Sequence, residues 1–395
     1  MNDKQKPSIR FKGFTEAWEQ RKFSELAKTR RGLTYSPTNI RENGIRVLRS
    51  SNIDEDCFVC SDEDVFVVSN AVNIPYVCNG DILITSANGS TRLVGKHAII
   101  RGIADKSAVH GGFMLLASAQ NPEFVNALMG APWYAKFIGL YVAGGNGAIG
   151  NLNKNDLDEQ IVFVPSNAEQ KVIGTYFRNI DNLITLHQRK YDKLVNVKKS
   201  MLEKMFPRDG KNVPEIRFSG FTEAWEQRKV QDVADRFDNL RIPVAANLRV
   251  HGTTPYYGAN GIQDYVEGFT HDGEFVLVAE DGANDLKNYP VKCVTGRIWV
   301  NNHAHVLQGK AGIADNSFLA FAISQSDIES LLVGGGRAKL NAETLMSIEF
   351  RLPCLQEQYR IGEYLTQLDH LITLHQREVE KLQNIKKSCL EKMFA

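Results

Sequence analysis

At 395 residues, with 43% hydrophobic and 24% charged residues, the chain has the composition of a globular protein and is long enough for two domains. Its net charge of +1 gives no global support to nucleic-acid binding, which usually shows as a strong basic excess. The polar N-terminal segment, the lack of any long apolar stretch and six cysteines without framework spacing lead us to expect a cytoplasmic protein without a membrane segment.

The first recognisable element is a short segment, residues 9–22. It returns 207 positions later as residues 216–229, with a single difference. A near-identical copy at this distance indicates that the chain is built from two halves on one plan. We expect the Phe and Trp residues of each copy to fasten the following segment to the helix that arrives from the other half.

Each copy leads into a long insert, and the two inserts barely resemble each other. The first, residues 23–165, is 19 residues longer than the second, residues 230–353. Only a skeleton matches, since residues 80–85 and 273–278 are both a glycine followed by an apolar run typical of a buried strand. Short apolar runs broken by Gly, Asn and Pro predict a compact α+β domain in each insert.

A long helical pattern follows each insert, over residues 168–206 and 356–394. Apolar positions in both segments alternate in steps of three and four, which is typical of a coiled-coil seam. Without internal prolines each helix can reach about 58 Å at 1.5 Å per residue, and Pro207 ends the first. The first helix delivers the chain to the second insert and the second helix must run back, so we predict an antiparallel pair. In the alternative arrangement, each helix packs on its own domain.

Together these elements predict an α+β fold class with two globular domains separated by two long helices. The helices form an antiparallel coiled coil, and the whole is pseudo-twofold symmetric. The predicted divisions are residues 1–165 for the first domain, 166–206 for the first helix, 207–353 for the second domain and 354–395 for the second helix.

No catalytic or metal-binding pattern emerges from the chain. Residues 89–97 resemble a phosphate-binding loop, but five residues stand where four are needed and His97 replaces the magnesium-binding hydroxyl. His303 and His305 share one face of a predicted strand, and with no third ligand close in sequence we expect polar contacts there instead of metal. We therefore predict no enzyme and no metal site.

The loops of both inserts carry Arg, Lys, Asn, Ser and Tyr, the side chains that read base edges and grip phosphates. The same stretches are also turn formers, which is the alternative reading of each residue. In the first insert the candidate DNA-binding residues are Arg49, Ser50, Asn52, Ser86, Asn88, Ser90, Arg92 and Lys154. In the second insert they are Tyr256, Tyr257, Asn260, Asn284, Arg337, Lys339 and Asn341.

At this point the chain resembles the specificity subunit of a type I restriction–modification enzyme over essentially its whole length. The resemblance rests on Phe-x-Gly-Phe-x-x-x-Trp at residues 11–18 and 218–225. It rests also on Leu-Pro-x-x-x-Glu-Gln before the second long helix, which the first copy matches with Val164 in place of Leu. The motifs Pro-Tyr-Tyr-Gly-Ala-Asn-Gly-Ile and Asn-Asn-His-Ala-His-Val-Leu are similar to those of the family's target-recognition domains.

The resemblance implies a division of labour. Each insert is expected to be a target-recognition domain that reads one half of a bipartite, asymmetric sequence in double-stranded DNA, while the helices fix the spacer. Two modification (methyltransferase) subunits, which bind S-adenosylmethionine and methylate adenine at N6, are expected to dock on the helices. Restriction (translocase and nuclease) subunits are expected to join them for ATP-driven translocation and cleavage.

The chain itself is then a non-catalytic recognition subunit without a cofactor of its own, since S-adenosylmethionine, ATP and Mg belong to its partners. His187 and His375 occupy matching positions on the helix seam. They either form a polar layer that sets the register or contact the modification subunit, and the sequence leaves both readings open.

Two other classes of function also stay open. One is a non-enzymatic bivalent adaptor, with two ligand-binding modules on a coiled-coil rod. The other is a fused enzyme with concealed catalytic residues.

For the recognition subunit, the net charge of +1 leads us to expect weak DNA affinity of the isolated chain, because phosphate contacts dominate that affinity.

Overall fold

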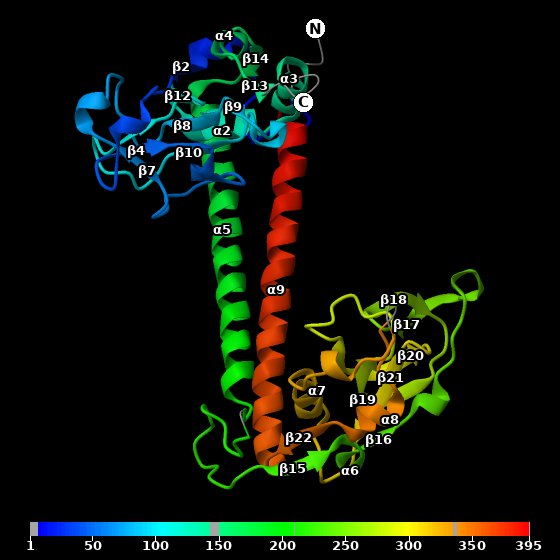
Figure 1. Ribbon diagram of the computed structural model, residues 1–395. Helices are drawn as coiled ribbons and strands as arrows, with labels where there is room; N and C mark the ends of the chain where they lie inside the picture. The colour runs from blue at the N-terminus through cyan, green and yellow to red at the C-terminus, as the bar shows by residue number, and fades with distance from the viewer. Residues whose placement is uncertain (1–6, 143–149, 209, 335–337, 395) are drawn as a thin grey trace. The chain divides into compact units, whose positions relative to one another are not determined.

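The structure is a computed structural model that describes residues 7–142, 150–208, 210–334 and 338–394 (Figure 1). The chain forms two compact units. The first unit combines residues 1–187 with residues 377–395, and the second unit is the continuous stretch 188–376. Each unit thus holds one insert and a part of each long helix. No helix in the described ranges is both long and apolar enough to cross a membrane.

The first unit consists of short strands arranged in small sheets, with helices packed on them. Its strands are β1 (Glu19–Lys22), β2 (Ala27–Arg31), β3 (Ile40–Arg41), β4 (Ile45–Leu48), β5 (Ile53–Asp54), β6 (Cys57–Phe58), β7 (Val65–Val67), β8 (Ile82–Thr85), β9 (Ala87–Asn88), β10 (His97–Ile99), β11 (Ala108–His110), β12 (Met114–Ala119), β13 (Gly150–Asn151) and β14 (Ile161–Val164). Its short helices are α1 (Phe23–Leu26), α2 (Pro122–Met129), α3 (Pro132–Tyr141) and α4 (Lys154–Asp158).

The buried strand expected after Gly80 is confirmed as β8, in which every residue is buried. It lies in an antiparallel sheet of order β10-β8-β12-β2, next to a second sheet of order β11-β4-β7-β3 in which β11 and β4 are parallel. Successive side chains of a strand point to opposite faces. Ile82 and Ile84 therefore join one core with Phe124 of α2, whereas Leu83 joins another with Leu116.

The second unit is organised around one larger sheet. Its strands are β15 (Glu226–Lys229), β16 (Ala234–Arg236), β17 (His251–Gly258), β18 (Gly261–Val266), β19 (His271–Ala279), β20 (Val291–Val300), β21 (Ala304–Gly309) and β22 (Glu349–Leu352). Its short helices are α6 (Val230–Val233), α7 (Asn316–Ser324) and α8 (Ala342–Ser347).

The strand order of the larger sheet is β16-β21-β19-β20-β17-β18, with β17 and β20 parallel and the other neighbours antiparallel. Its central strand β19 contains the second predicted apolar run. Val276 and Val278 pack with Phe318 of α7, and Phe275 and Leu277 face a separate core on the opposite side. Both inserts are therefore strand-rich α+β structures with a central strand buried on both faces.

The two long helices are α5 (Asn167–Lys204) and α9 (Leu355–Met393). They begin one residue before the predicted starts at 168 and 356. The first ends two residues before the predicted 206, and Phe206 leaves the helix to pack against Trp225 and Phe318.

Within each unit, α5 and α9 lie side by side and run antiparallel (Figure 1). In the first unit the Tyr176 hydroxyl lies 3.4 Å from Cys389 Sγ, and further along α5 Asp181 accepts a hydrogen bond from Lys386 at 2.9 Å. In the second unit Lys198 of α5 pairs with Asp369 of α9. This pair is the repeat copy of Asp181 and Lys386, as expected for a helix pair with internal twofold symmetry.

The repeated segments make the same contacts twice, once in each unit. The Arg10 guanidinium donates two hydrogen bonds of 2.7 Å to the fully buried carboxylate of Glu169, at the start of α5. Arg217 makes the equivalent bidentate pair with Glu357 of α9, at 2.7 and 2.8 Å. Paired hydrogen bonds of this kind satisfy a buried carboxylate that would otherwise be costly.

The tryptophans of the repeated segments perform the predicted fastening. The prediction was wrong for Phe11 and Phe218, which pack on Tyr176 and Tyr364 of the helix that follows the same insert. The Trp18 ring packs edge-on against Phe394, just past the end of α9, with ring centroids 5.8 Å apart. Trp225 packs in the same way against Phe206, just past the end of α5, at 6.1 Å. The near-identity of the two segments thus reflects a frame that is used twice to attach an insert to a helix end.

Candidate nucleic-acid interface

In the first unit, four loop segments meet where the buried strand β8 ends. We name residues 49–52, 86–92, 111–114 and 150–152 the first loop cluster. The backbone N–H groups of Ser86 and Ala87 donate to the carbonyl of Phe113, at 2.9 and 3.1 Å. The two-residue strands β9 and β13 pair with each other, which ties residues 86–92 to residues 150–152.

The remaining segment of the first loop cluster is held by side chains and backbone together. The Asn88 amide donates to the Ser50 hydroxyl at 3.0 Å, and the Gly111 N–H donates to the carbonyl of Leu48 at 2.8 Å. These bonds bring Arg49 and Ser50 beside the loop that follows β8. The structure therefore gathers most of the predicted residues of the first insert at one place.

The predicted residues of the first insert differ in exposure. Arg49, Ser90 and Arg92 are exposed, and Ser50, Asn88 and Lys154 are partly exposed. Asn52 is only 1% exposed, because its amide donates to the carbonyl of Val59 and to Asp64 while its carbonyl accepts from the N–H of Arg49. Asn52 thus fixes the backbone that presents Arg49.

Two further predicted residues of the first insert are held by partners inside the unit. Ser86 is 6% exposed and forms the base of the loop after β8. Lys154, in the first turn of α4, forms an ion pair with Asp158 one turn later. Neither side chain projects freely from the loop cluster in this structure.

The second unit has an equivalent arrangement, the second loop cluster, formed by residues 258–261, 280–284, 301–303 and 339–341. Asn260, in the turn between β17 and β18, donates to the carbonyl of Gly282 and accepts from the N–H of Asn284, both at 2.9 Å. The two predicted asparagines are therefore joined directly, and both are exposed.

Lys339 meets the same loop from the other side. Its ammonium lies 2.8 Å from Glu280, and its backbone forms an isolated antiparallel β-bridge with Asp281. Arg241 holds the other carboxylate oxygen of Glu280 at 2.7 Å. Burial alone would raise the pKa of Glu280, but the hydrogen bonds from Lys339 and Arg241 outweigh it and hold this pKa below its usual range. Glu280 is therefore an anion, and it binds the cations Arg241 and Lys339 beside this loop.

The two predicted tyrosines lie inside the second unit. Tyr256 is 1% exposed, its hydroxyl accepts from the N–H of Val244 at 2.9 Å, and the Arg249 guanidinium lies 4.1 Å from its ring centre. Tyr257 is 7% exposed and burial raises its pKa. Of the remaining predicted residues, Asn341 is exposed at the start of α8, and Arg337 lies outside the described residues.

The two histidines considered as half a metal site make polar contacts in the structure. His303 lies 2.5 Å from Asp281, and both ring nitrogens of buried His305 face oxygen acceptors, Asp238 at 2.7 Å and the carbonyl of Leu340 at 2.9 Å. Asp238, Glu280 and His305 are close enough to share a cation. Arg241 and Lys339 already neutralise this group, so we do not assign a metal to it.

The backbone connections of the two loop clusters are the same. The N–H of Ser86 donates to the carbonyl of Phe113, and the N–H of Glu280 donates to the carbonyl of His303, both at 2.9 Å. The carbonyls of Ser86 and Glu280 accept in turn from Leu152 and Leu340, both at 2.7 Å. One backbone layout thus carries different side chains in the two units.

Phe113 is a member of the first loop cluster that the sequence did not reveal. It is 71% exposed, although the sequence Gly-Gly-Phe-Met-Leu-Leu leads straight into the buried strand β12. In the sequence it therefore resembles the first core residue of a strand. The double glycine before it is the only sequence signal of a turn.

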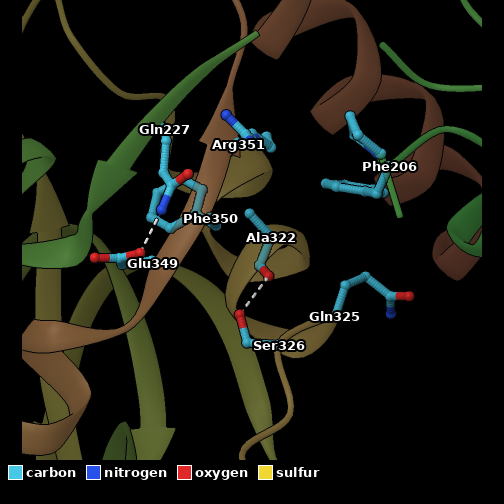
Figure 2. A pocket seen from close by; sticks show the side chains of 9 residues that line it. Phe206, Gln227, Ala322, Gln325, Ser326, Glu349, Phe350 and Arg351 are labelled. Carbon is cyan, nitrogen blue, oxygen red and sulfur yellow. Dashed lines mark hydrogen bonds between the residues drawn. The ribbon is translucent and has the colours of Figure 1, made fainter. Parts of the chain in front are cut away.

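A separate hollow of about 330 Å³ lies in the second unit near the end of α5 (Figure 2). Phe206, Arg351 and Gln325 line it, and Gln227 donates to Glu349 across one of its walls. None of the predicted DNA-binding residues in the described ranges lines this hollow. It lies between the frame, which contributes Phe206, Pro207 and Gln227, and the second insert, which contributes its other lining residues.

Comparison with known proteins supplies the family. Residues 15–196 and 222–384 match the family model of the type I restriction modification DNA specificity domain. Over 146 residues the chain is 44% identical to a putative type I restriction enzyme specificity subunit of Haemophilus influenzae, a match that spans 37% of this chain and only 38% of that relative. It is 24% identical to a putative type I restriction enzyme specificity subunit of Methanocaldococcus jannaschii, over 79% of this chain and 76% of the relative.

The fold agrees with these matches. The crystal structure of the specificity subunit of a type I restriction–modification system from M. genitalium superposes with a TM-score of 0.71 at 13% identity, covering 99% of each chain. This likeness confirms the predicted fold class of two α+β domains with paired long helices. Because the two matched ranges account for most of its length, the chain belongs to the family of type I restriction–modification specificity subunits.

Proposed function

We propose that this chain is the DNA-reading subunit of a type I restriction–modification complex. Each insert reads one half of a bipartite, asymmetric target in double-stranded DNA, and the paired helices fix the spacer between the halves. Two modification subunits dock on the helices and methylate adenine, and restriction subunits join them. The chain contributes no catalytic residue, and its partner subunits bind S-adenosylmethionine, ATP and Mg.

The observation that carries this proposal is the pair of loop clusters. A module that reads a particular sequence needs its own set of side chains, whereas the scaffold that presents them can be shared. The two clusters meet this requirement, because their backbone connections match while Ser86 and Phe113 of the first stand where the second has Glu280 and His303. A bivalent adaptor for one repeated ligand would not need this difference, and the family match gives that alternative no support.

The exposed members of the clusters are the proposed DNA contacts. They are Arg49, Ser50, Asn88, Ser90 and Arg92 in the first unit and Asn260, Asn284, Lys339 and Asn341 in the second. Lys154, which follows the first cluster and would have to leave Asp158, and Arg337 are retained from the sequence. Asn52, Ser86, Tyr256 and Tyr257 are proposed to act beneath the surface by holding these loops. We propose the same domain limits as before, with the inserts ending at residues 165 and 353.

The helices carry a feature that fits two copies of one partner. Leu183 and Leu186 of α5 are 44% and 46% exposed, and their repeat copies in α9, Leu371 and Leu374, are 39% and 44% exposed. Keeping exposed leucines in both copies has a cost in solubility unless a partner covers them. We assign these two leucine pairs to the docking of the two modification subunits, one on each pair.

A reconstituted methylation assay tests the proposal. The chain, the cognate modification subunit and their mixture are each given duplex DNA and labelled S-adenosylmethionine. We expect methyl transfer to adenine only in the mixture. Transfer by the pure chain would contradict a non-catalytic subunit, and equal transfer by the modification subunit alone would contradict a role in target recognition.

A further inference from the structure

We propose that Phe113 is a specificity-determining residue that makes apolar contact with a base of the first half-site. This inference rests on the proposed function and deepens it, since it assigns a particular side chain to the reading of one base. Three features of the residue support it: its exposure, its rigid backbone and its place among polar base-reading groups.

The exposure of Phe113 has no explanation within the folded chain. At 71% it exceeds that of every other large apolar side chain in the described ranges. The neighbours Met114, Leu115 and Leu116 are almost fully buried, so the chain turns from core to solvent within one residue. An aromatic ring held in water costs free energy that contact with a ligand recovers.

The backbone beneath Phe113 is rigid. Its carbonyl accepts hydrogen bonds from both Ser86 and Ala87, and the N–H of Met114 donates to the carbonyl of Gly111 at 2.8 Å, which closes a tight turn. A Cβ atom at Gly111 would lie only 3.3 Å from the side chain of Val47, so the turn sits tightly on the core beneath it. The ring is therefore presented on a fixed support, as a specific contact requires.

The groups beside Phe113 favour DNA over a protein partner. The same first loop cluster contains the cations Arg49 and Arg92 and the amide and hydroxyl groups of Asn88 and Ser90. Arginine and asparagine read base edges in the major groove, where apolar side chains contact the thymine methyl group. An apolar residue among such groups fits the reading of bases, whereas a protein-docking patch is normally a larger apolar surface.

The second unit supplies an internal comparison. His303 occupies the position of Phe113, since the carbonyl of each accepts from the first residue of the loop after the central strand. His303 is held against Asp281 and offers hydrogen-bonding groups in place of an apolar ring. The same position in the two units thus carries two different kinds of base-reading chemistry, which matches the reading of two different half-sites.

The test is a genome-wide map of N6-methyladenine in cells with the cognate modification subunit, comparing wild type with Phe113→Ala. The wild-type map defines the bipartite motif. We expect Phe113→Ala to relax one position of one half while the other half and the spacer stay the same, and Phe113→Trp to retain the restriction at that position. Ile40→Ala is the matched control, because Ile40 is 43% exposed in the same unit but lies in β3, at the opposite edge of its sheet from β11.

A binding measurement covers the case in which the variant methylates no site. The reconstituted complex is titrated with a duplex that carries the wild-type motif and with one in which only the first half-site is scrambled. We expect Phe113→Ala to weaken binding of the intact motif by roughly tenfold and to leave binding of the scrambled duplex unchanged, as for the loss of one base contact.

An unchanged motif together with unchanged affinity would overturn the inference. So would a variant that fails to assemble with the modification subunit, since Phe113 would then be a protein contact. The absence of any bipartite motif in the wild type would instead overturn the proposed function, so the two failures can be told apart.

Discussion

At the residue scale, two glycines set how closely each long helix approaches its insert. Gly174 in α5 and its repeat copy Gly362 in α9 are buried in mid-helix, a position where glycine normally costs about 1 kcal/mol relative to alanine. A Cβ atom at Gly174 would lie 2.8 Å from the backbone nitrogen of Phe124, and one at Gly362 would lie 3.0 Å from that of Phe318. The helices α2 and α7 begin at these contacts.

Gly174→Ala and Gly362→Ala should therefore destabilise the protein, in spite of the better helix propensity of alanine. We expect a loss of about 1–3 kcal/mol for each, as for overpacked cores, measured by urea unfolding. Gly139→Ala is the matched control, since Gly139 is an exposed helical glycine with nothing near its missing Cβ. That variant should be neutral or slightly more stable. Equal effects at all three positions would contradict the close approach.

Buried His110 makes stability depend on pH. It is fully buried, and burial lowers its pKa from 6.5 to about 4, so its imidazole is neutral in the folded chain. The unfolded chain binds a proton below about pH 6.5 while the folded chain does not. The contribution of His110 to the free energy of unfolding is therefore fully present above pH 6.5. It falls by about 1.4 kcal/mol per pH unit as the pH falls towards 4.

The variant His110→Gln tests this dependence, because glutamine fills a similar volume and does not titrate. We expect the melting temperature of the wild type to fall more steeply between pH 6.5 and 5 than that of the variant. Parallel curves over this range would show that His110 is already charged in the folded protein.

Whether the location of a residue could be predicted from the sequence depended on the kind of contact that the residue makes. The contacts of Trp18 and Trp225 were predictable, because near-identical segments must meet near-identical partners. The burial of Asn52 and Tyr256 was not, because a polar side chain in a turn-rich loop reads the same whether its hydrogen bonds go to the protein or to a ligand. The exposure of Phe113 was not predicted either. An apolar residue just before a buried strand gives the same sequence pattern whether it is buried or exposed.

At the element scale, the proposed docking of the modification subunits makes a quantitative prediction. The double variant Leu183→Glu, Leu186→Glu should bind one modification subunit instead of two, because charge on one exposed leucine pair abolishes one of two equivalent contacts. Its counterpart Leu371→Glu, Leu374→Glu should do the same. Light scattering or native mass spectrometry of the reconstituted complex gives the stoichiometry.

The control for this prediction is Val172→Glu. Val172 is 39% exposed on α5, but its repeat copy is Arg360, so it is not part of a duplicated apolar surface. Glutamate is a good helix former in all of these positions, which keeps the helices intact. Full occupancy by two subunits in both double variants would rule out the leucines as docking surfaces.

The elements were predictable to different degrees. The long helices begin one residue from their expected starts, since an unbroken seam with a proline after the first leaves little choice. The parallel pairings of β4 with β11 and of β17 with β20 could not be foreseen. Strand order depends on contacts between residues far apart in sequence, and the two inserts share too little sequence for one to inform the other.

At the scale of the whole molecule, the charge balance predicts the behaviour of the isolated chain on DNA. With a net charge of +1 the chain has little capacity to neutralise phosphates by itself. We expect micromolar or weaker binding of the purified chain at physiological salt, and much tighter binding by the complex with modification subunits, both measured by fluorescence anisotropy. Nanomolar binding by the chain alone would contradict this expectation.

We propose that one chain with two different inserts on a duplicated frame reads two different half-sites. A genome-wide map of N6-methyladenine, in cells with the cognate modification subunit, tests it most directly when residues 23–165 are exchanged for the first insert of another specificity subunit. We expect a bipartite motif with a fixed gap that requires this chain, and a change in only one half after the exchange. A motif that changes in both halves, or no motif from a chain that still assembles with the modification subunit, would contradict it.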